Sequence, residues 1–139
     1  MSDTVTKIHI VLPGDPPTTT QKNTVRFNRR TGRTYHSKAF LQVREELIEK
    51  LAPFIPEKPL DGYLALTIKA YWTPPKAHKR KHWKNTKPDG DNSIAVIADQ
   101  LEKLGFVAND SRFCIEHIEK HYDAEHPRLE IEIKEIKGL

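Results

Sequence analysis

Apolar residues recur along this chain with two different periods, and each period predicts a different element. Alternation with a period of two, the pattern of a strand with one buried face, marks residues 7–12, 64–72, 113–122 and 128–136. The last two segments are separated by "DAEHP", which predicts an antiparallel hairpin between them. The apolar side chains that share a face in the two clearest strands are Leu64, Leu66, Ile68, Ala70 and Trp72, and Leu129, Ile131 and Ile133.

Spacings of three and four residues predict two helices. The first should follow Ser37, a good N-cap, and end before Pro53. The second should run from about Asn92 to Leu104, with Asp91 or Asn92 as its cap and Gly105 in the C′ position. The apolar stripes of the two helices are Phe40, Val43, Leu47 and Leu51, and Ile94, Ile97, Leu101 and Leu104.

Two short strands, Thr24–Phe27 and Arg33–His36, are predicted around the turn "NRRTG", where Gly32 would take a positive φ. Strands and helices are intermixed, and 139 residues suit one domain. The pattern therefore predicts a single α+β domain over residues 1–139, in which a mixed β-sheet packs against two main helices and ends in a C-terminal β-hairpin.

Composition narrows the class of protein. Charged residues make up 30% and hydrophobic residues 37%, which is typical of a soluble globular chain. No apolar run approaches the roughly 20 residues that cross a bilayer, and the first residues lack the pattern of a signal peptide. The single cysteine, Cys114, excludes an intrachain disulfide. We expect a cytoplasmic protein.

The basic residues are concentrated in one loop. The segment 76–87, "KAHKRKHWKNTK", has six Lys or Arg residues and no acid, and without them the net charge of +4 would be about −2. Such a cluster, with Trp83 placed to stack on an unpaired base, suits nucleic acid; the alternative is a solvated surface loop. The arginines of "NRRTGR" could form a second contact. The predicted DNA-binding residues are Lys76, Lys79, Arg80, Lys81, Lys84, Lys87, Arg29, Arg30 and Arg33.

An acidic group follows the basic loop. Asp89 and Asp91 flank Gly90, and if that segment is extended both carboxylates point the same way. Asp110 comes just after the second helix and could rejoin them only if the chain turns back. Three carboxylates at one point would repel one another unless a cation such as Mg²⁺ neutralised them. The alternative is that these acids are ordinary turn and cap residues.

The run "KPDGDN", followed by Asp99, "LG" and "ND" (Asn109 and Asp110), resembles the signature of the RusA family of Holliday junction resolvases. The resemblance implies a homodimer that binds branched DNA, a four-way junction, and makes paired Mg²⁺-dependent nicks in DNA recombination and repair. The metal-binding and catalytic acids would be Asp89, Asp91 and Asp110, and Asp99 would be structural or would support them.

Two residues depart from the family pattern. Ala95 stands where the family has a lysine that assists the phosphate chemistry, and Asn109 replaces the first acid of the downstream pair. A cation from elsewhere, such as Lys84 or Lys87, could compensate, or the enzyme could be slower. A non-catalytic junction-binding protein of the same fold is the first competing hypothesis, and a general interaction domain is the second.

Overall fold

A four-stranded sheet forms the centre of the computed structural model, which describes residues 6–18, 25–36, 38–78 and 82–137. Its strands are β1 (Lys7–Pro13), β4 (Tyr63–Trp72), β5 (Phe113–Tyr122) and β6 (Arg128–Ile136), in the spatial order β1-β6-β4-β5. β6 is antiparallel to β1 and β4, whereas β4 and β5 are parallel. The sheet is mixed, which together with the two helices confirms the predicted α+β class.

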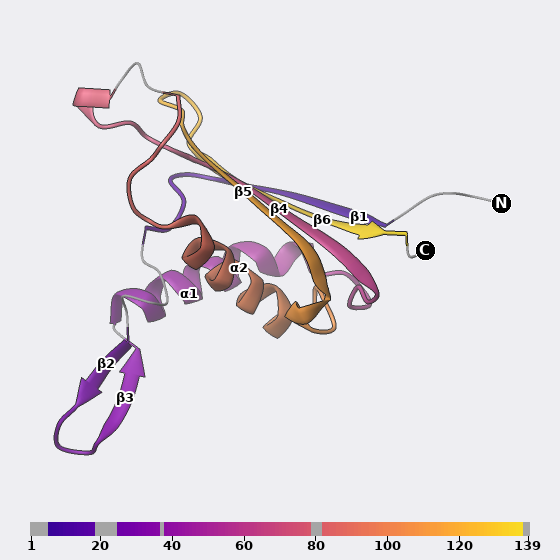
Figure 1. Cartoon of the computed structure of the whole chain (residues 1–139), viewed down its shortest axis with the longest axis horizontal. Coiled ribbons are helices and arrows are strands. Elements are labelled where there is room, and N and C mark those ends of the chain that lie inside the picture. The colour runs from indigo at the N-terminus through magenta and orange to yellow at the C-terminus, as the bar shows by residue number, and fades with distance from the viewer. Residues whose placement is uncertain (1–5, 19–24, 37, 79–81, 138–139) are drawn as a thin grey trace.

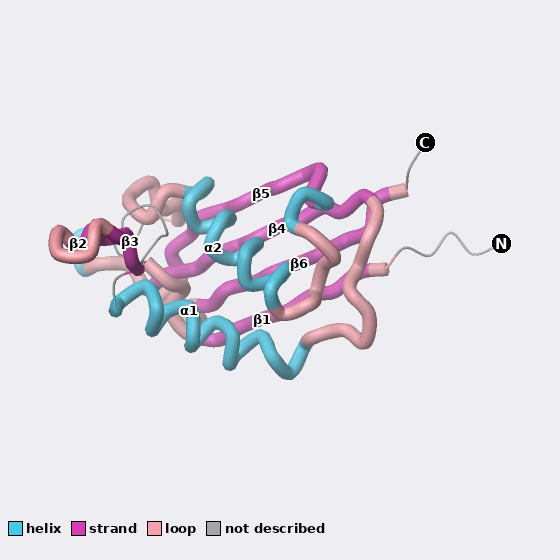
Figure 2. The backbone as a smooth tube through the Cα atoms, turned by 90° about the horizontal axis from the view of Figure 1, so that it is seen from below, coloured by secondary structure: helices cyan, strands magenta, loops and turns pink. Residues whose placement is uncertain are grey.

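Both helices, α1 (Lys38–Leu51) and α2 (Gly90–Lys103), lie across the same face of this sheet (Figures 1 and 2). Along β4 the alternate side chains that face the helices are buried, as the sequence predicted. Val43 of α1 is only half-buried, and the predicted cap Ser37 lies outside the described residues. No helix among the described residues is long and apolar enough to cross a membrane.

The two C-terminal strands run in opposite directions through a short turn, as predicted, but they do not pair with each other. β4 is inserted between them and forms a ladder with each. The turn is held by Asp123, whose Oδ1 accepts hydrogen bonds from the amides of Glu125 and His126, both at 3.0 Å. β5 is therefore an edge strand, and one of its long edges is open to other segments.

A small separate hairpin precedes α1. It consists of β2 (Val25–Asn28) and β3 (Arg33–His36), and it projects away from the sheet and helices (Figure 1). Asn28 closes its tip, because its carbonyl accepts from the amide of Gly32 at 2.8 Å and its side chain accepts from the amide of Arg30 at 2.9 Å. Gly32 has a φ of +69°, which confirms the predicted turn.

Candidate functional site

An open pocket of about 380 Å³, which we call the acid pocket, lies between α2 and the start of β5. Its carboxylates come from three elements: Asp91 and Asp99 from α2, Asp110 from the 3₁₀ turn η4 (Asp110–Arg112), and Glu116 from β5. The remaining lining residues are Ile94, Ala95 and Ala98. The structure therefore brings together two of the three predicted acids, Asp91 and Asp110.

The start of α2 differs from the prediction and determines where the first two acids lie. Asp89, rather than Asp91 or Asn92, is the N-cap residue, and its carbonyl accepts from the amide of Ser93 at 3.1 Å. Gly90, the first residue of the helix, packs tightly on β5, because a Cβ at this position would lie 2.9 Å from Cγ2 of Ile118. Asp91 is thus in the first helical turn, where the free amides and the positive end of the helix dipole lie.

The expectation that Asp89 and Asp91 point the same way from an extended segment was wrong, since the helix starts between them. Asp89 does not line the pocket. It lies close enough to the ammonium of Lys120 for the two charges to interact. Lys120 Nζ also donates to the carbonyls of Thr86 at 2.6 Å and Pro88 at 2.7 Å, so it fixes the chain that leads into Asp89. Burial, followed by repulsion from Lys84, lowers the pKa of Lys120.

The chain returns Asp110 to the pocket through a tight helix end. Gly105, with a φ of +88°, is the C′ residue, as predicted. Its amide donates to the carbonyl of Glu102, and the amide of Phe106 donates to that of Leu101, which is a Schellman motif. Phe106 is then fully buried, which anchors the return. The carboxylate of Glu102 accepts from the amide of Asp110 at 3.0 Å and holds the last acid at the end of α2.

Two charged residues of the pocket were not singled out as site residues from the sequence. Glu116 is exposed and projects from the same face of β5 as Ile118 and Lys120. Asp99, expected to have a structural or supporting role, lines the pocket and pairs with Lys103 at 3.0 Å. Lys103 is therefore the cation that the structure ties to the pocket wall.

Comparison with known families decides the class of protein. The family model described as "Endodeoxyribonuclease RusA" matches residues 13–134, which is most of the chain. The chain belongs to the RusA family. RusA membership indicates an endodeoxyribonuclease of the Holliday junction resolvase type. A search of curated proteins found no match.

The two departures from the RusA pattern can be placed in the structure. Ala95 lines the pocket, one helical turn after Asp91. Neither Lys84 nor Lys87, the cations considered as substitutes, lines it. Asn109 has a structural use, because its Oδ1 accepts from the amide of Ser111 at 2.8 Å and caps η4.

The donors in the pocket suit Mg²⁺ rather than a softer metal. All the charged groups are carboxylates, and Mg²⁺ is held in proteins by one or two carboxylates together with waters and substrate phosphates. Within the described residues, no three His, Cys, Asp or Glu side chains converge closely enough to hold an ion by themselves. Asp91 and Asp110 therefore fit an ion that shares its remaining ligands with water and DNA.

Residues 82–84 of the basic loop pair with the free edge of β5. The amide of Tyr122 donates to the carbonyl of His82 at 2.7 Å, and the amide of Lys84 donates to that of Lys120 at 2.9 Å. Lys84 Nζ donates to Thr86 Oγ1 at 2.7 Å and lies 5.3 Å from the ring centroid of Tyr122. Lys76 and Lys87 are exposed, whereas Lys79, Arg80 and Lys81 lie outside the described residues.

The tip of the β2–β3 hairpin, which projects from the rest of the molecule in Figure 1, carries three exposed arginines: Arg29, Arg30 and Arg33.

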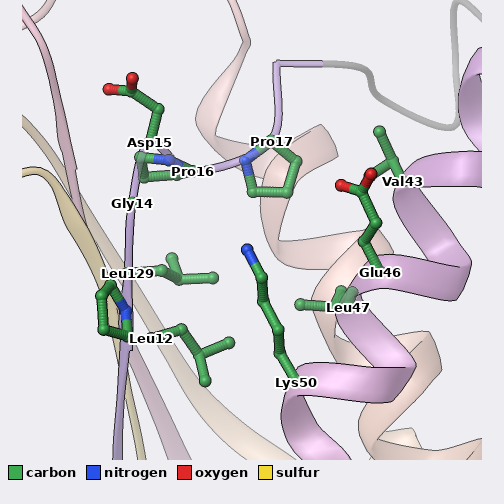
Figure 3. Close-up of a pocket in the computed structure, with 11 residues that line it drawn as sticks. Leu12, Gly14, Asp15, Pro16, Pro17, Val43, Glu46, Leu47, Lys50 and Leu129 are labelled. Atoms are coloured by element: carbon green, nitrogen blue, oxygen red, sulfur yellow. The ribbon is translucent and has the colours of Figure 1, made fainter.

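A second pocket, of about 70 Å³, lies between α1 and the loop that follows β1 (Figure 3). Glu46 and Lys50 of α1 and Pro16 and Pro17 of that loop line it. This pocket is smaller than the acid pocket. Its two acids, Asp15 and Glu46, come from opposite walls, and the carboxylate of Asp15 points away from the cavity (Figure 3).

Proposed function

We propose that this chain is a Mg²⁺-dependent, structure-selective endodeoxyribonuclease that resolves four-way DNA junctions by paired nicks in recombination and repair. The observation that carries the proposal is the meeting of Asp91 and Asp110 in one open pocket along α2, the helix that directly follows the basic loop in the chain. RusA family membership supports the same activity.

Each acid has a separate part in this proposal. Asp91 and Asp110 would hold the metal ion, and Asp91 lies in the first turn of α2, where the helix dipole attracts negative charge. Asp89 acts beside them from the N-cap, where Lys120 fixes the preceding backbone. A Mg²⁺ ion held by these acids would supply an activated water and would screen the charge that develops on the phosphate. The exposed lysines and arginines of the basic loop and hairpin bind the DNA backbone.

The enzyme would act as a homodimer. A four-way junction has near two-fold symmetry, and two nicks on opposite strands require two sites related by the same symmetry. One chain offers one acid pocket of this kind among its described residues. Two copies would place one such pocket at each of the two phosphates that are cut on opposite strands.

A non-catalytic junction-binding protein is the second candidate function, and Ala95 is the observation that favours it. Its methyl group lines the acid pocket and cannot stabilise the charge that develops on the phosphate or on the leaving sugar oxygen. Lys103 offers a cation at the pocket wall, but its ammonium is 3.0 Å from Asp99 Oδ2 and partly neutralised by it. Both candidate functions predict that the protein binds a four-way junction, but only the first predicts that it cuts the junction.

The test is incubation of the purified protein with a labelled four-way junction and a linear duplex of matched sequence, in Mg²⁺ and in EDTA. Symmetric nicks on the junction alone, lost in EDTA and in Asp91→Asn, are expected. Cutting that persists unchanged in Asp91→Asn would refute the site. Tight binding without cutting would support the non-catalytic candidate, and Ala95→Lys would then be expected to gain cleavage.

A further inference from the structure

Trp83 stands at the outer end of a stack of rings on the edge of the sheet. Its ring lies 4.4 Å from that of His121, at an interplanar angle of 30°, and Tyr71 stacks on His121 at 4.6 Å and 11°. Two rings cannot occupy the same face of an imidazole at these distances, so His121 lies between them. The guanidinium of Arg128 completes the series, 3.7 Å from the centroid of Tyr71. We call Arg128, Tyr71, His121 and Trp83 the ring stack.

The inner members of the ring stack are held firmly. His121 is only 4% exposed, its Nε2 hydrogen-bonds Glu119 at 2.8 Å, and its Nδ1 lies 3.1 Å from Nε2 of His82. The guanidinium of Arg128 donates to Glu130 at 2.7 Å and to Asp123 at 3.0 Å. Trp83 is also tied through its backbone, which forms a β-bridge with His121. The stack is therefore a rigid support for its last ring.

The outer member differs from the rest, because Trp83 is 60% exposed. His121 covers one face of its indole, and His82 meets it at nearly a right angle. Exposing a large aromatic ring to water costs free energy. Every nucleobase has a flat face that can stack on such a ring and cover it. Cations also flank Trp83 in the sequence of the basic loop, where they would attract the phosphates on either side of a stacked base.

We propose that Trp83 is a stacking site for one unpaired nucleobase at the branch point of the DNA. The inference rests on the proposed function only in taking branched DNA as the ligand. Glu116 in the acid pocket and His121 beneath Trp83 are five residues apart on the edge strand β5, about 17 Å along it, and they lie on opposite faces of the sheet. A branched DNA molecule that passes around this edge can reach both places, with the stacked base several nucleotides from the phosphate in the acid pocket.

The probe is 2-aminopurine, a fluorescent base whose emission falls when it stacks on an aromatic ring. It is placed once as an unpaired nucleotide at the branch of a four-way junction and once within a fully paired duplex. Binding is measured in EDTA, so that loss of cutting and loss of stacking are read separately. The wild-type protein should quench the unpaired probe, and Trp83→Phe should retain most of the quenching.

Trp83→Ala should abolish that quenching and weaken binding of the junction with the unpaired base by about fivefold to a hundredfold, while changing duplex binding less than about twofold. Trp83→Leu, which keeps an apolar contact on His121, should behave like Trp83→Ala. Tyr63→Ala is the matched control, because Tyr63 is 58% exposed at the other end of β4. Unchanged quenching in Trp83→Leu, or equal loss of affinity for both DNAs, would overturn the proposal whether or not the protein cuts.

Discussion

The two sides of the α2 N-terminus use charged side chains in opposite ways, although both are built on β5. Near the basic loop, Lys120 donates to two backbone carbonyls, and Glu119 on the opposite face of β5 accepts from two histidines. On the side of the acid pocket, Asp91, Asp110 and Glu116 are exposed, and their carboxylates form no ion pair within the described part of the chain. Charges of the first kind hold the fold, whereas we propose that those of the second bind the metal ion.

The contact of Gly90 with Ile118 separates these two sides. Ile118 lies on β5 between Glu116 and Lys120, all three on the helix-facing side. The tight contact brings the helix N-terminus onto the strand, so that Asp91 turns toward Glu116 while Asp89 stays near Lys120. Variants on the two sides should therefore separate activity from stability.

The largest expected effect is on catalysis. Asp91→Asn and Asp110→Asn should each lower the rate of junction cleavage at least about a hundredfold, since even residues that only support a metal ligand are worth about 10- to 100-fold. The free energy of unfolding should change by less than about 1 kcal/mol, because neither carboxylate holds the fold. Cleavage rates and urea unfolding measure the two quantities. Glu125→Gln, an exposed acid in the β5–β6 turn, is the control and should alter neither.

Lys120→Met should show the reverse pattern. Removal of the ammonium leaves the carbonyls of Thr86 and Pro88 without their donor, and the free energy of unfolding should fall by about 1–3 kcal/mol. Cleavage should fall less than in Asp91→Asn, because the acids remain. Lys103→Met is the matched control: it removes one exposed pair on the helix surface and should cost no more than about 0.5 kcal/mol. Equal stability of the two variants would contradict the distinction.

Gly90→Ala tests the contact between the two sides. The added methyl would lie 2.9 Å from Ile118, and the strain should outweigh the better helix propensity of alanine, for a net loss of about 1 kcal/mol in the free energy of unfolding. In Ile118→Ala the obstructing atom is absent, so adding Gly90→Ala to that background should cost much less. If the losses in the free energy of unfolding simply add in this double-mutant cycle, the contact between Gly90 and Ile118 does not constrain the position of the helix N-terminus.

The smallest expected effect is on the stability of the fold at low pH. Hydrogen bonds from His117, and then from His121, lower the pKa of Glu119 below its ordinary value of 4.5. The carboxylate therefore contributes stability above the unfolded-state value, and that contribution is lost as pH falls through the lowered pKa. The wild type should be more stable than Glu119→Gln by less than about 1 kcal/mol near pH 6, and the difference should shrink toward pH 3. A gap that grows in acid would contradict this sign.

Most elements could be predicted from the sequence because their apolar periods are regular. The alternation of β4 and the stripe of α1 reflect one buried face each, and Gly105 and Gly32 mark turns that need a positive φ. The strand order could not be predicted, because nothing in the turn after Tyr122 indicates that β4 lies between β5 and β6. The start of α2 was misplaced for a related reason: local capping preferences favoured Asp91 or Asn92, and a tertiary contact at Gly90 selected Asp89.

Glu116 was missed because of a bulge. Simple alternation from the buried Phe113 would place Ile115 on the helix side and Glu116 on the open side. A register shift between Leu64 and Ala65 leaves Cys114 as an extra residue, so that Glu116 pairs with the buried Leu66 and faces α2. The meeting of Asp91 and Asp110 in one pocket was expected because the family resemblance supplied the long-range link that periodicity lacks.

Binding of Mn²⁺, as a paramagnetic substitute for Mg²⁺, tests the central claim most directly, namely that the acid pocket holds the metal. Amide signals of the labelled protein near the ion would be broadened at low Mn²⁺ concentration. The account predicts broadening at residues 89–91 and 110–116, reversed by excess Mg²⁺ and weakened in Asp91→Asn. Broadening confined to Glu130 and Glu132 on the open face of the sheet, or unchanged by Asp91→Asn, would contradict it.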